Sequence, residues 1–202
     1  MSTSETAQTT DTTDVLPVIF LKSNRITMRP PCEGDAPYFT KWMNDPEVRL
    51  YLTRYLPISE SDEVEWIRNL GKRSATDVTL VIVVDGKPIG VMSIGQINWK
   101  DRTGTTGAVI GNKEYWGRGY GTDAKMAVLD YAFNTLNLRK IMSRVWAFNK
   151  RSLAYSLHCG YTTEGRLRKQ HFANGRFYDE ILLGLFKKEW LPYWRSYRKK
   201  HL

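Results

Sequence analysis

The chain has 202 residues, which is enough for a single domain with a buried core. Its 42% hydrophobic and 12% aromatic residues exclude a wholly disordered protein, and no apolar run approaches the roughly 20 residues that a membrane-spanning helix needs. The formal net charge of +9 favours an anionic partner, such as a polyphosphate ligand, a nucleic acid or a ribosomal surface.

The first 14 residues, MSTSETAQTTDTTD, differ in composition from the rest of the chain. They contain eight Ser or Thr and three acidic residues, but no Lys or Arg. This segment lacks the basic start and apolar stretch of a secretory signal and the arginines of a mitochondrial presequence. We therefore predict a disordered tail over residues 1–14 and a single domain over residues 15–202, which without the three tail acids carries +12.

The two cysteines, Cys32 and Cys159, lie far apart and lack the spacing of metal ligands. We expect free thiols in a reducing, cytoplasmic compartment, with a single disulfide between them as the alternative. The C-terminal segment WRSYRKKHL carries much of the excess positive charge, and we expect it to be a solvated basic tail.

Apolar patterning and turn residues predict the elements in chain order. The first half gives a strand at residues 25–30, a helix from near Asp35 to before Pro46, a helix capped by Ser59 or Ser61, and a hairpin around Asp85-Gly86. The second half gives the strand TTGAVIG, a helix from about Thr122 to Asn134, the strand KIMSRVWAF, the helix KRSLAYSLHCG, and two strands around the Asn174-Gly175 turn. This order predicts an α/β (α+β) fold with a mixed, mostly antiparallel central sheet and helices on both faces.

The stretch EYWGRGYGTDA places three glycines within Gly117–Gly121, directly before the predicted helix. Its spacing fits neither a Walker A loop nor the G-x-G-x-x-G dinucleotide fingerprint. Free N–H groups at a helix start still carry partial positive charge and can hold phosphate oxygens, and Arg118 adds a full charge. Taken alone, the pattern fits a phosphate site and an ordinary surface turn capped by Thr122 or Asp123 equally well.

The loop, the strand before it and the strand–helix unit after it resemble the GNAT superfamily of acyl-CoA-dependent N-acetyltransferases. The (Q/R)-x-x-G-x-(G/A) loop of that family matches residues 116–121, with Trp116 in place of the usual Gln or Arg. A second signature, NKRSLAYSLHCGY, is similar to the family's N-x-x-(A/S) helix that ends in Gly-aromatic. The segments YWGRGYGTDA and NGRFYDEILLGLFKKEW also resemble the RimJ/RimL-type branch, and the resemblance covers about residues 18–190.

The resemblance implies that acetyl-CoA is the cosubstrate and that the strand over residues 107–111 splays from the strand over residues 141–145. The pantetheine arm would lie in the gap and bond to the strand backbone. The implied coenzyme-binding residues are Val109, Ile110, Gly111, Trp116, Gly117, Arg118, Gly119, Tyr120, Gly121, Thr122, Asn149, Arg151 and Ser152. A helix-start cap is the alternative role for Asn149, and simple exposure is the alternative for Lys150 and Arg151.

Acetyl transfer to an amine needs a neutral amine, a polarised thioester carbonyl and a protonated leaving thiolate. The backbone N–H of Val109 is the expected oxyanion donor. Ser156 stands where many relatives carry a tyrosine acid, so it is the first candidate for the acid and its neighbour Tyr155 is the second. An ordinary serine on the helix surface is the alternative interpretation of Ser156.

Relatives often carry a glutamate base at the position that Thr105 holds here. Glu180 is the candidate substitute, with Asp179 beside it on the opposite face of the strand. Surface exposure or a structural salt bridge is the alternative role for each of them. His158 and Cys159 point about 100° apart on a helix, which favours direct attack by the amine over a cysteine intermediate. The three histidines lack ligand spacing, so no metal is expected.

Three functions follow from these patterns. The first is an N-acetyltransferase for a protein N-terminal α-amine, such as that of a ribosomal protein, acting as a monomer or homodimer. The second is transfer to a small amine such as an amino sugar, antibiotic or polyamine, although a basic body weighs against polyamines. The third is a nucleic-acid or ribosome-binding module without catalysis. The aromatic residues Trp42, Tyr51, Tyr55 and Trp66 are candidates for the acceptor groove or for the core.

Overall fold

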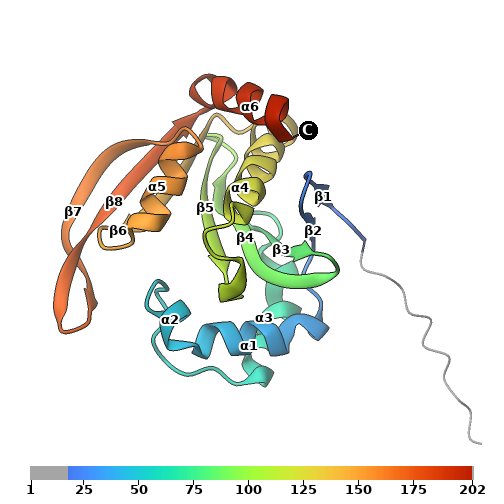
Figure 1. Ribbon diagram of the computed structural model, residues 1–202, viewed down its shortest axis with the longest axis vertical. Helices are drawn as coiled ribbons and strands as arrows, with labels where there is room; N and C mark the ends of the chain where they lie inside the picture. Colours follow the sequence, from blue (N-terminus) through green and yellow to red (C-terminus); the bar gives the residue numbers. More distant parts are fainter. Residues whose placement is uncertain (1–17, 202) are drawn as a thin grey trace, which may run out of the picture.

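The computed structural model describes residues 18–201, so the tail predicted over residues 1–14 lies outside the described residues. The strands are β1 Leu21–Lys22, β2 Thr27–Arg29, β3 Val78–Val84, β4 Lys87–Asn98, β5 Thr103–Ile110, β6 Lys140–Trp146, β7 Thr162–Ala173 and β8 Arg176–Phe186 (Figure 1). The helices are α1 Ala36–Asn44, α2 Pro46–Arg49, α3 Glu60–Asn69, α4 Tyr120–Asp130, α5 Lys150–His158 and α6 Lys187–His201. Short helical turns are η1 Glu33–Asp35, η2 Leu70–Arg73, η3 Lys113–Tyr115 and η4 Tyr131–Thr135.

The strands form one eight-stranded sheet in the order β1-β2-β3-β4-β5-β6-β8-β7. Every neighbouring pair is antiparallel except β5 and β6, which are parallel. The predicted fold class, a mixed and mostly antiparallel sheet with helices, is therefore confirmed.

The sheet buries side chains on both of its faces. In β3, Leu80 and Ile82 pack in one core with residues of α4 and α6, whereas Val81 and Val83 pack in a second core with residues of α1 and α3. Successive side chains of a strand point to opposite faces, so the uninterrupted apolar run VTLVIVV is explained by a strand covered on both sides.

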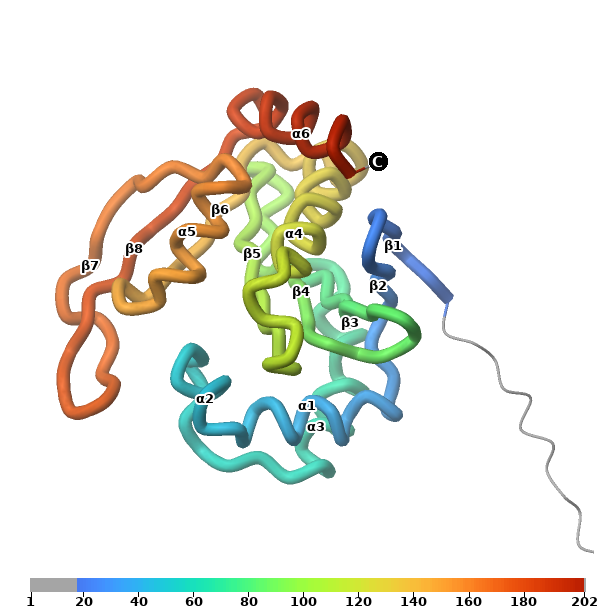
Figure 2. Tube along the Cα trace, in the orientation of Figure 1, coloured from blue at the N-terminus to red at the C-terminus, as the bar shows by residue number. Residues whose placement is uncertain are grey.

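The two central strands pair over only a short length. β5 and β6 are in register at Thr103↔Lys140, Gly104↔Ile141 and Thr105↔Met142, and at no later position. Beyond this point β5 follows β4 as far as Ile110, while β6 follows β8 as far as Trp146. The strands lie together near α6 and move apart toward α2 (Figure 2). The predicted splay is confirmed, and it leaves a wedge in the middle of the sheet.

The C-terminal segment differs from the expected solvated tail. Residues 194–201 form the second half of α6, in which Trp190 and Tyr197 are buried against the first core while Arg195, Arg198, Lys199 and Lys200 are exposed. The Tyr197 hydroxyl donates to Asp123 Oδ1 at 2.7 Å, and Asp123 also pairs with Arg25 at 2.6 Å. The basic side chains are exposed as expected, but the segment is a packed helix, because aromatic residues at helical spacing provide one apolar face among the positive charges.

Candidate active site

A cavity of about 780 Å³ opens where β5 and β6 diverge, and we call it the wedge cavity. Gly107 and Ala108 are exposed to it although they lie in the middle of the sheet. Of the sequence-predicted residues, it is lined by Val109, Ile110, Trp116, Gly117, Gly119, Tyr120, Gly121, Thr122, Asn149, Arg151, Ser152, Tyr155 and Glu180. The lining does not include Gly111, Arg118, Lys150 or Ser156. The fold thus gathers most of the predicted site from four separate segments.

The glycine loop offers a row of free backbone donors at the rim of the cavity. The first helical bond of α4 runs from the Asp123 N–H to the Gly119 carbonyl at 3.1 Å. Within residues 18–201, none of the N–H groups of residues 117–122 donates to a protein acceptor. Gly117 and Gly119 have φ of 74° and 85°, a left-handed conformation that L-residues rarely adopt. Unpaired N–H groups at a helix start fit a diphosphate, so this row supports the predicted loop role.

Arg151 compensates for the absence of a Gln or Arg at position 116. The Trp116 indole donates to the Ile110 carbonyl at 2.6 Å, which fixes its ring. The Arg151 guanidinium lies 4.0 Å from the centre of that ring and 5.5 Å from the Tyr51 ring. Cation–π contacts hold an arginine in place without neutralising it. A positive charge therefore stands beside the glycine loop, supplied from α5.

Of two predicted coenzyme contacts, that of Gly111 needs correction, whereas that of Arg118 stays a prediction. The Gly111 N–H already donates to the Ile89 carbonyl at 2.9 Å, and a Cβ at this position would lie 2.1 Å from the Trp42 ring. Gly111 is therefore required for packing and has no N–H left for a ligand. Arg118 is exposed and outside the cavity lining, and its carbonyl accepts a hydrogen bond from Arg25 at 3.0 Å.

The expected oxyanion donor also changes. Donation from Gly111 to Ile89 means that the opposed pair Gly90↔Ile110 is not hydrogen-bonded, so the next pair, Val91↔Val109, is. The Val109 N–H thus points to β4. The alternation turns the backbone of Ala108 and Ile110 toward the wedge, and Ala108 replaces Val109 as the candidate oxyanion donor.

The start and first turns of α5 form one wall of the cavity. The Asn149 side chain accepts from the Ser152 N–H at 3.0 Å, so the alternative role of Asn149 as a helix cap is the one observed. Tyr155 lines the cavity two turns later. Ser156 is 0% exposed, and within residues 18–201 its hydroxyl has no hydrogen-bond partner. The preference for Ser156 over Tyr155 as the acid is therefore reversed by the helix phase.

Glu180 lies on the opposite wall, on β8, and is 4% exposed. Its carboxylate pairs with Arg144 at 2.6 Å, and the other oxygen lies 3.0 Å from His171 Nε2, outside hydrogen-bonding geometry. Asp179 points elsewhere, because it accepts from the Lys169 N–H at 2.8 Å and from Arg166 at 2.6 Å. These bonds lower the pKa of Asp179. Glu180 is thus the carboxylate of this pair that lines the cavity.

His171 and Arg144 are members of the site that sequence patterns do not indicate. In the β7–β8 hairpin, whose turn is Asn174-Gly175, His171 pairs with Tyr178. Tyr178 lies two residues before Glu180, so the sequence does not indicate a contact between His171 and Glu180. A bulge between Leu167 and His171, where Lys169 has a φ of 52°, shifts the register of β7 against β8. A bulge of this kind re-aims side chains, and no local sequence signal announces it here.

A second, smaller cavity of about 260 Å³ adjoins the first, and we call it the acceptor-side cavity. Its walls are Phe39, Met43, Arg54, Glu63, Trp66, Val91 and Ser93. It shares Gly107, Ala108 and Val109 with the wedge cavity. The two cavities therefore meet at the strand that carries the candidate oxyanion donor.

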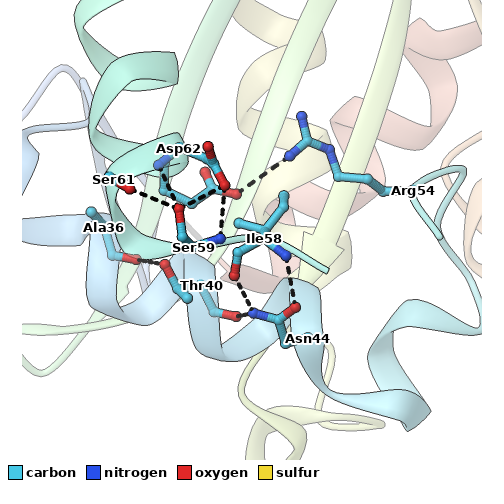
Figure 3. A network of polar contacts seen from close by, with 9 residues as sticks. Ala36, Thr40, Asn44, Arg54, Ile58, Ser59, Ser61 and Asp62 are labelled. Carbon is cyan, nitrogen blue, oxygen red and sulfur yellow. Dashed lines mark hydrogen bonds and ion pairs between the residues drawn. The ribbon is translucent and has the colours of Figure 1, made fainter. Parts of the chain in front are cut away.

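Glu63 is the carboxylate of the acceptor-side cavity. It is 5% exposed and lies 3.9 Å from Arg54, which extends toward the start of α3 (Figure 3). Burial raises the pKa of Glu63, and the Arg54 charge opposes this rise. Hydrogen bonds between Asn44 and Ile58 at 2.7 and 3.0 Å fix the loop that carries Arg54 (Figure 3). The sequence gives no sign of this cavity, because α1, α3 and β5 meet only in the fold.

The candidate groove aromatics take different places. Trp66 lines the acceptor-side cavity and Tyr51 the wedge cavity, whereas Trp42 is a core residue and Tyr55 is 79% exposed.

Cys32 and Cys159 are both free, and burial raises the pKa of the Cys159 thiol to about 11. A buried thiol of this kind is a poor nucleophile at neutral pH, which agrees with direct attack by the amine.

Two further findings apply to residues 18–201. No group of three or more His, Cys, Asp or Glu side chains is arranged there to hold a metal ion. None of the helices in that range is both long and apolar enough to cross a membrane.

Comparison with known proteins identifies the family. Residues 25–162 match the acetyltransferase (GNAT) domain. The chain is 27% identical over 174 residues to the uncharacterized N-acetyltransferase p20 of Bacillus licheniformis, a match that covers 84% of this chain and 97% of p20. Its fold is similar to spermidine N-acetyltransferase of Vibrio cholerae, solved with CoA and spermine (TM-score 0.75, 24% identity, 83% and 98% of the chains). It is also similar to Mycobacterium smegmatis RimJ, solved with CoA-disulfide (TM-score 0.77, 20% identity, 87% and 88% of the chains). The protein belongs to the GNAT family of N-acetyltransferases, and acetyl-CoA is its acetyl donor.

Proposed function

We propose that this N-acetyltransferase, in keeping with its RimJ/RimL resemblance, acetylates the α-amino group of a peptide or protein N-terminus. The observation that carries the proposal is the junction of the two cavities at Gly107, Ala108 and Val109. One cavity offers free N–H groups for a diphosphate, and the other offers apolar walls around a carboxylate. A donor and an acceptor can thus reach the same stretch of β5 from opposite faces of the sheet.

The donor is held by backbone groups in this proposal. The N–H groups of residues 117–122 bind the diphosphate, with Arg151 as the neighbouring positive charge. The pantetheine arm extends β5 on its open side, where Ala108 and Ile110 face the wedge. Bound acetyl-CoA supplies the thioester, and the Ala108 N–H stabilises the oxyanion that forms on its carbonyl.

Two side chains on opposite walls of the wedge cavity move the protons. The amine nitrogen attacks the thioester carbonyl and gives one proton to Glu180. The carbon–sulfur bond breaks, and the departing thiolate takes the proton of the Tyr155 hydroxyl. Glu180 then returns its proton to Tyr155 through solvent, which completes the cycle. A binding module without catalysis would not need both groups on one cavity.

The pairing of acids with arginines favours an acceptor that has one amine. Glu180 pairs with Arg144, and Glu63 pairs with Arg54. Neither cavity therefore presents a row of uncompensated carboxylates for the second and third ammonium groups of a polyamine. An α-amine also suits a modest base, because its pKa of about 8 leaves it partly neutral at physiological pH.

A polyamine acceptor is the second candidate. It is favoured by the fold similarity to the V. cholerae enzyme, which was solved with spermine. The two candidates differ in their need for negative charge, so a direct competition between acceptors separates them.

A thiol-release assay with acetyl-CoA tests the proposal. Short peptides with free N-termini are compared with spermidine and with the same peptides after N-acetylation. We expect kcat/KM for the free peptides to exceed that for spermidine at least tenfold, and no release with the blocked peptides. Faster release with spermidine would overturn the acceptor assignment.

Matched variants of neighbouring carboxylates test the proton acceptor. Glu180→Gln is expected to lower kcat by about 10²–10⁴-fold, the range for a lost general base. Asp179→Asn, next in sequence but outside the cavity, is expected to keep kcat within about threefold. Equal effects of the two substitutions would remove Glu180 from this role.

A further inference from the structure

Lys125 is a buried charge that the transfer described above does not use. It lies on α4 and is 1% exposed, yet no carboxylate within residues 18–201 forms an ion pair with it. Burying an ammonium without a counter-ion is costly. The desolvation cost of the ammonium must therefore be offset either by its neighbours in the fold or by an anion that binds in the cavity.

Hydrogen bonds place this ammonium at the apex of the wedge. Lys125 Nζ donates to Thr106 Oγ1 at 3.1 Å. Thr106 directly follows the last β5–β6 pair, and its hydroxyl reaches the Met142 carbonyl on β6 at 3.3 Å. The Tyr161 hydroxyl completes the cluster at 2.9 Å from Thr106 Oγ1. Thr106 thus ties the charge to the point where the two strands separate.

Two tyrosine rings enclose the ammonium. Lys125 Nζ lies 4.9 Å from the centre of the Tyr155 ring and 5.0 Å from that of Tyr161. Burial by itself lowers the pKa of Lys125, whereas the charges that Tyr155 and Tyr161 carry when ionised raise it, and the net direction is upward. The faces of the two rings also favour the charged ammonium, and an ammonium favours negative charge close to it.

Of the titratable groups around Lys125, one faces the wedge cavity. Burial raises the pKa of Tyr161 to about 12 and that of Cys159 to about 11, so both stay neutral near pH 7. Asp123, on the same helix, is already bound by Arg25 and Tyr197. Tyr155 alone among these groups lines the cavity. Tyr155, whose ring faces the ammonium, thus lies between Lys125 and an anion in the wedge, beside Thr106, which accepts the Lys125 hydrogen bond and also lines the cavity.

We propose that Lys125 is a positioning residue whose charge, acting through Tyr155, stabilises the coenzyme A thiolate that leaves during transfer. This inference rests on the proposed acetyl transfer. The carbon–sulfur bond gives its electron pair to sulfur, the thiolate takes the Tyr155 proton, and the Lys125 ammonium compensates the resulting phenolate. The proton that the amine has lost to Glu180 restores Tyr155 through solvent, so charge and atoms balance.

Lys125→Met and Lys125→Arg test the inference through turnover. Removal of the charge is expected to lower kcat at least tenfold with KM for acetyl-CoA within twofold, because the effect belongs to the leaving group. Lys125→Arg, which keeps the charge, is expected to recover most of kcat. Lys125→Met should not lower the Tm, since an apolar side chain replaces a buried unpaired charge. A lower Tm with a proportionate loss of activity in both variants would indicate a structural role and overturn the proposal.

A double-mutant cycle with Tyr155→Phe identifies the route. If Lys125 acts through Tyr155, the double variant should be no slower than Tyr155→Phe alone. Independent, additive losses would contradict this route. Thr106→Val, which keeps the charge but removes the hydrogen bond that holds it, provides a milder variant and should lower kcat without raising KM.

An acceptor-free measurement separates this inference from the proposed function. The thiol of bound CoA is titrated by the ultraviolet absorbance of its thiolate, in complexes with the wild type and with Lys125→Met. We expect ionisation at least one pH unit lower in the wild-type complex. Equal titrations would overturn the role of Lys125 even in an active enzyme. A shifted titration without transfer to any amine would overturn the proposed function and leave the electrostatic role standing.

Discussion

Gly119→Ala is the sharpest test of whether the free N–H groups of residues 117–122 bind a diphosphate. We call this row of donors the diphosphate cradle. Gly119 has a φ of 85°, and a Cβ there would lie 2.8 Å from Arg25 Nη2. An L-residue in the left-handed region costs about 1–2 kcal/mol. In the variant, the loop either keeps the left-handed conformation and its strain, or it relaxes and turns the N–H groups that follow position 119 away from the ligand. A hydrogen bond to a charged group contributes about 1.5–3 kcal/mol, so losing two of them weakens coenzyme A binding by roughly a hundredfold or more.

Isothermal titration with two ligands isolates this effect. Coenzyme A is expected to bind Gly119→Ala about a hundredfold more weakly, whereas pantetheine, which has no diphosphate, should bind it as it binds the wild type. Gly86→Ala is the matched control, because Gly86 has a φ of 75° in the β3–β4 turn and no atom lies within 4 Å of an added Cβ. It carries the same backbone strain far from the cavity. A coenzyme A Kd within threefold of wild type in Gly119→Ala would refute the cradle.

Two further predictions concern buried groups. Ser156→Ala should keep kcat within twofold and leave the Tm unchanged or higher. The buried Ser156 hydroxyl has no hydrogen-bond partner within residues 18–201, so its removal relieves a desolvation cost. A tenfold loss of kcat would restore Ser156 as the acid. Burial raises the pKa of Cys159 from 9.0 to about 11, so the folded state favours the neutral thiol and its stability should be constant below pH 9 and fall as the pH rises toward 11. Urea unfolding should show a loss of about 1 kcal/mol between pH 8.5 and pH 10 that Cys159→Ala lacks, and equal losses in both proteins would contradict this origin.

Local patterns were sufficient for the regular elements of the chain. The Asp85-Gly86 turn lies between β3 and β4 as expected, and Ser59 caps α3 with Asp62 returning the bond to its backbone. These elements depend on neighbours in sequence, such as a turn that needs positive φ or a helix start that needs an acceptor. The helical spacing of the aromatic residues in α6 also predicts a packed helix, but the many basic residues between them favoured the prediction of a tail.

The glycine loop was also predictable, because the phosphate-binding role proposed for it depends on backbone conformation within a few residues. Gly117 and Gly119 take the left-handed conformation that their identity permits, and the N–H groups after them stay free. Such a cradle is a local property of the chain, and it can be predicted before the fold is known.

Which side chains meet at the wedge depends on how distant segments of the chain pack together. Helix phase buries Ser156 and turns Tyr155 to the cavity, and strand register turns Ala108 rather than Val109 toward the open side of β5. The contacts of Lys125 with Tyr155 join α4 to α5, and those of Glu180 with Arg144 join β8 to β6. The regular elements and the conformation of the loop follow from short-range conformational preference, so the order of residues was enough to predict them. The proposed acid, the proposed base and Lys125 come from segments far apart in the chain, so packing and register brought them together.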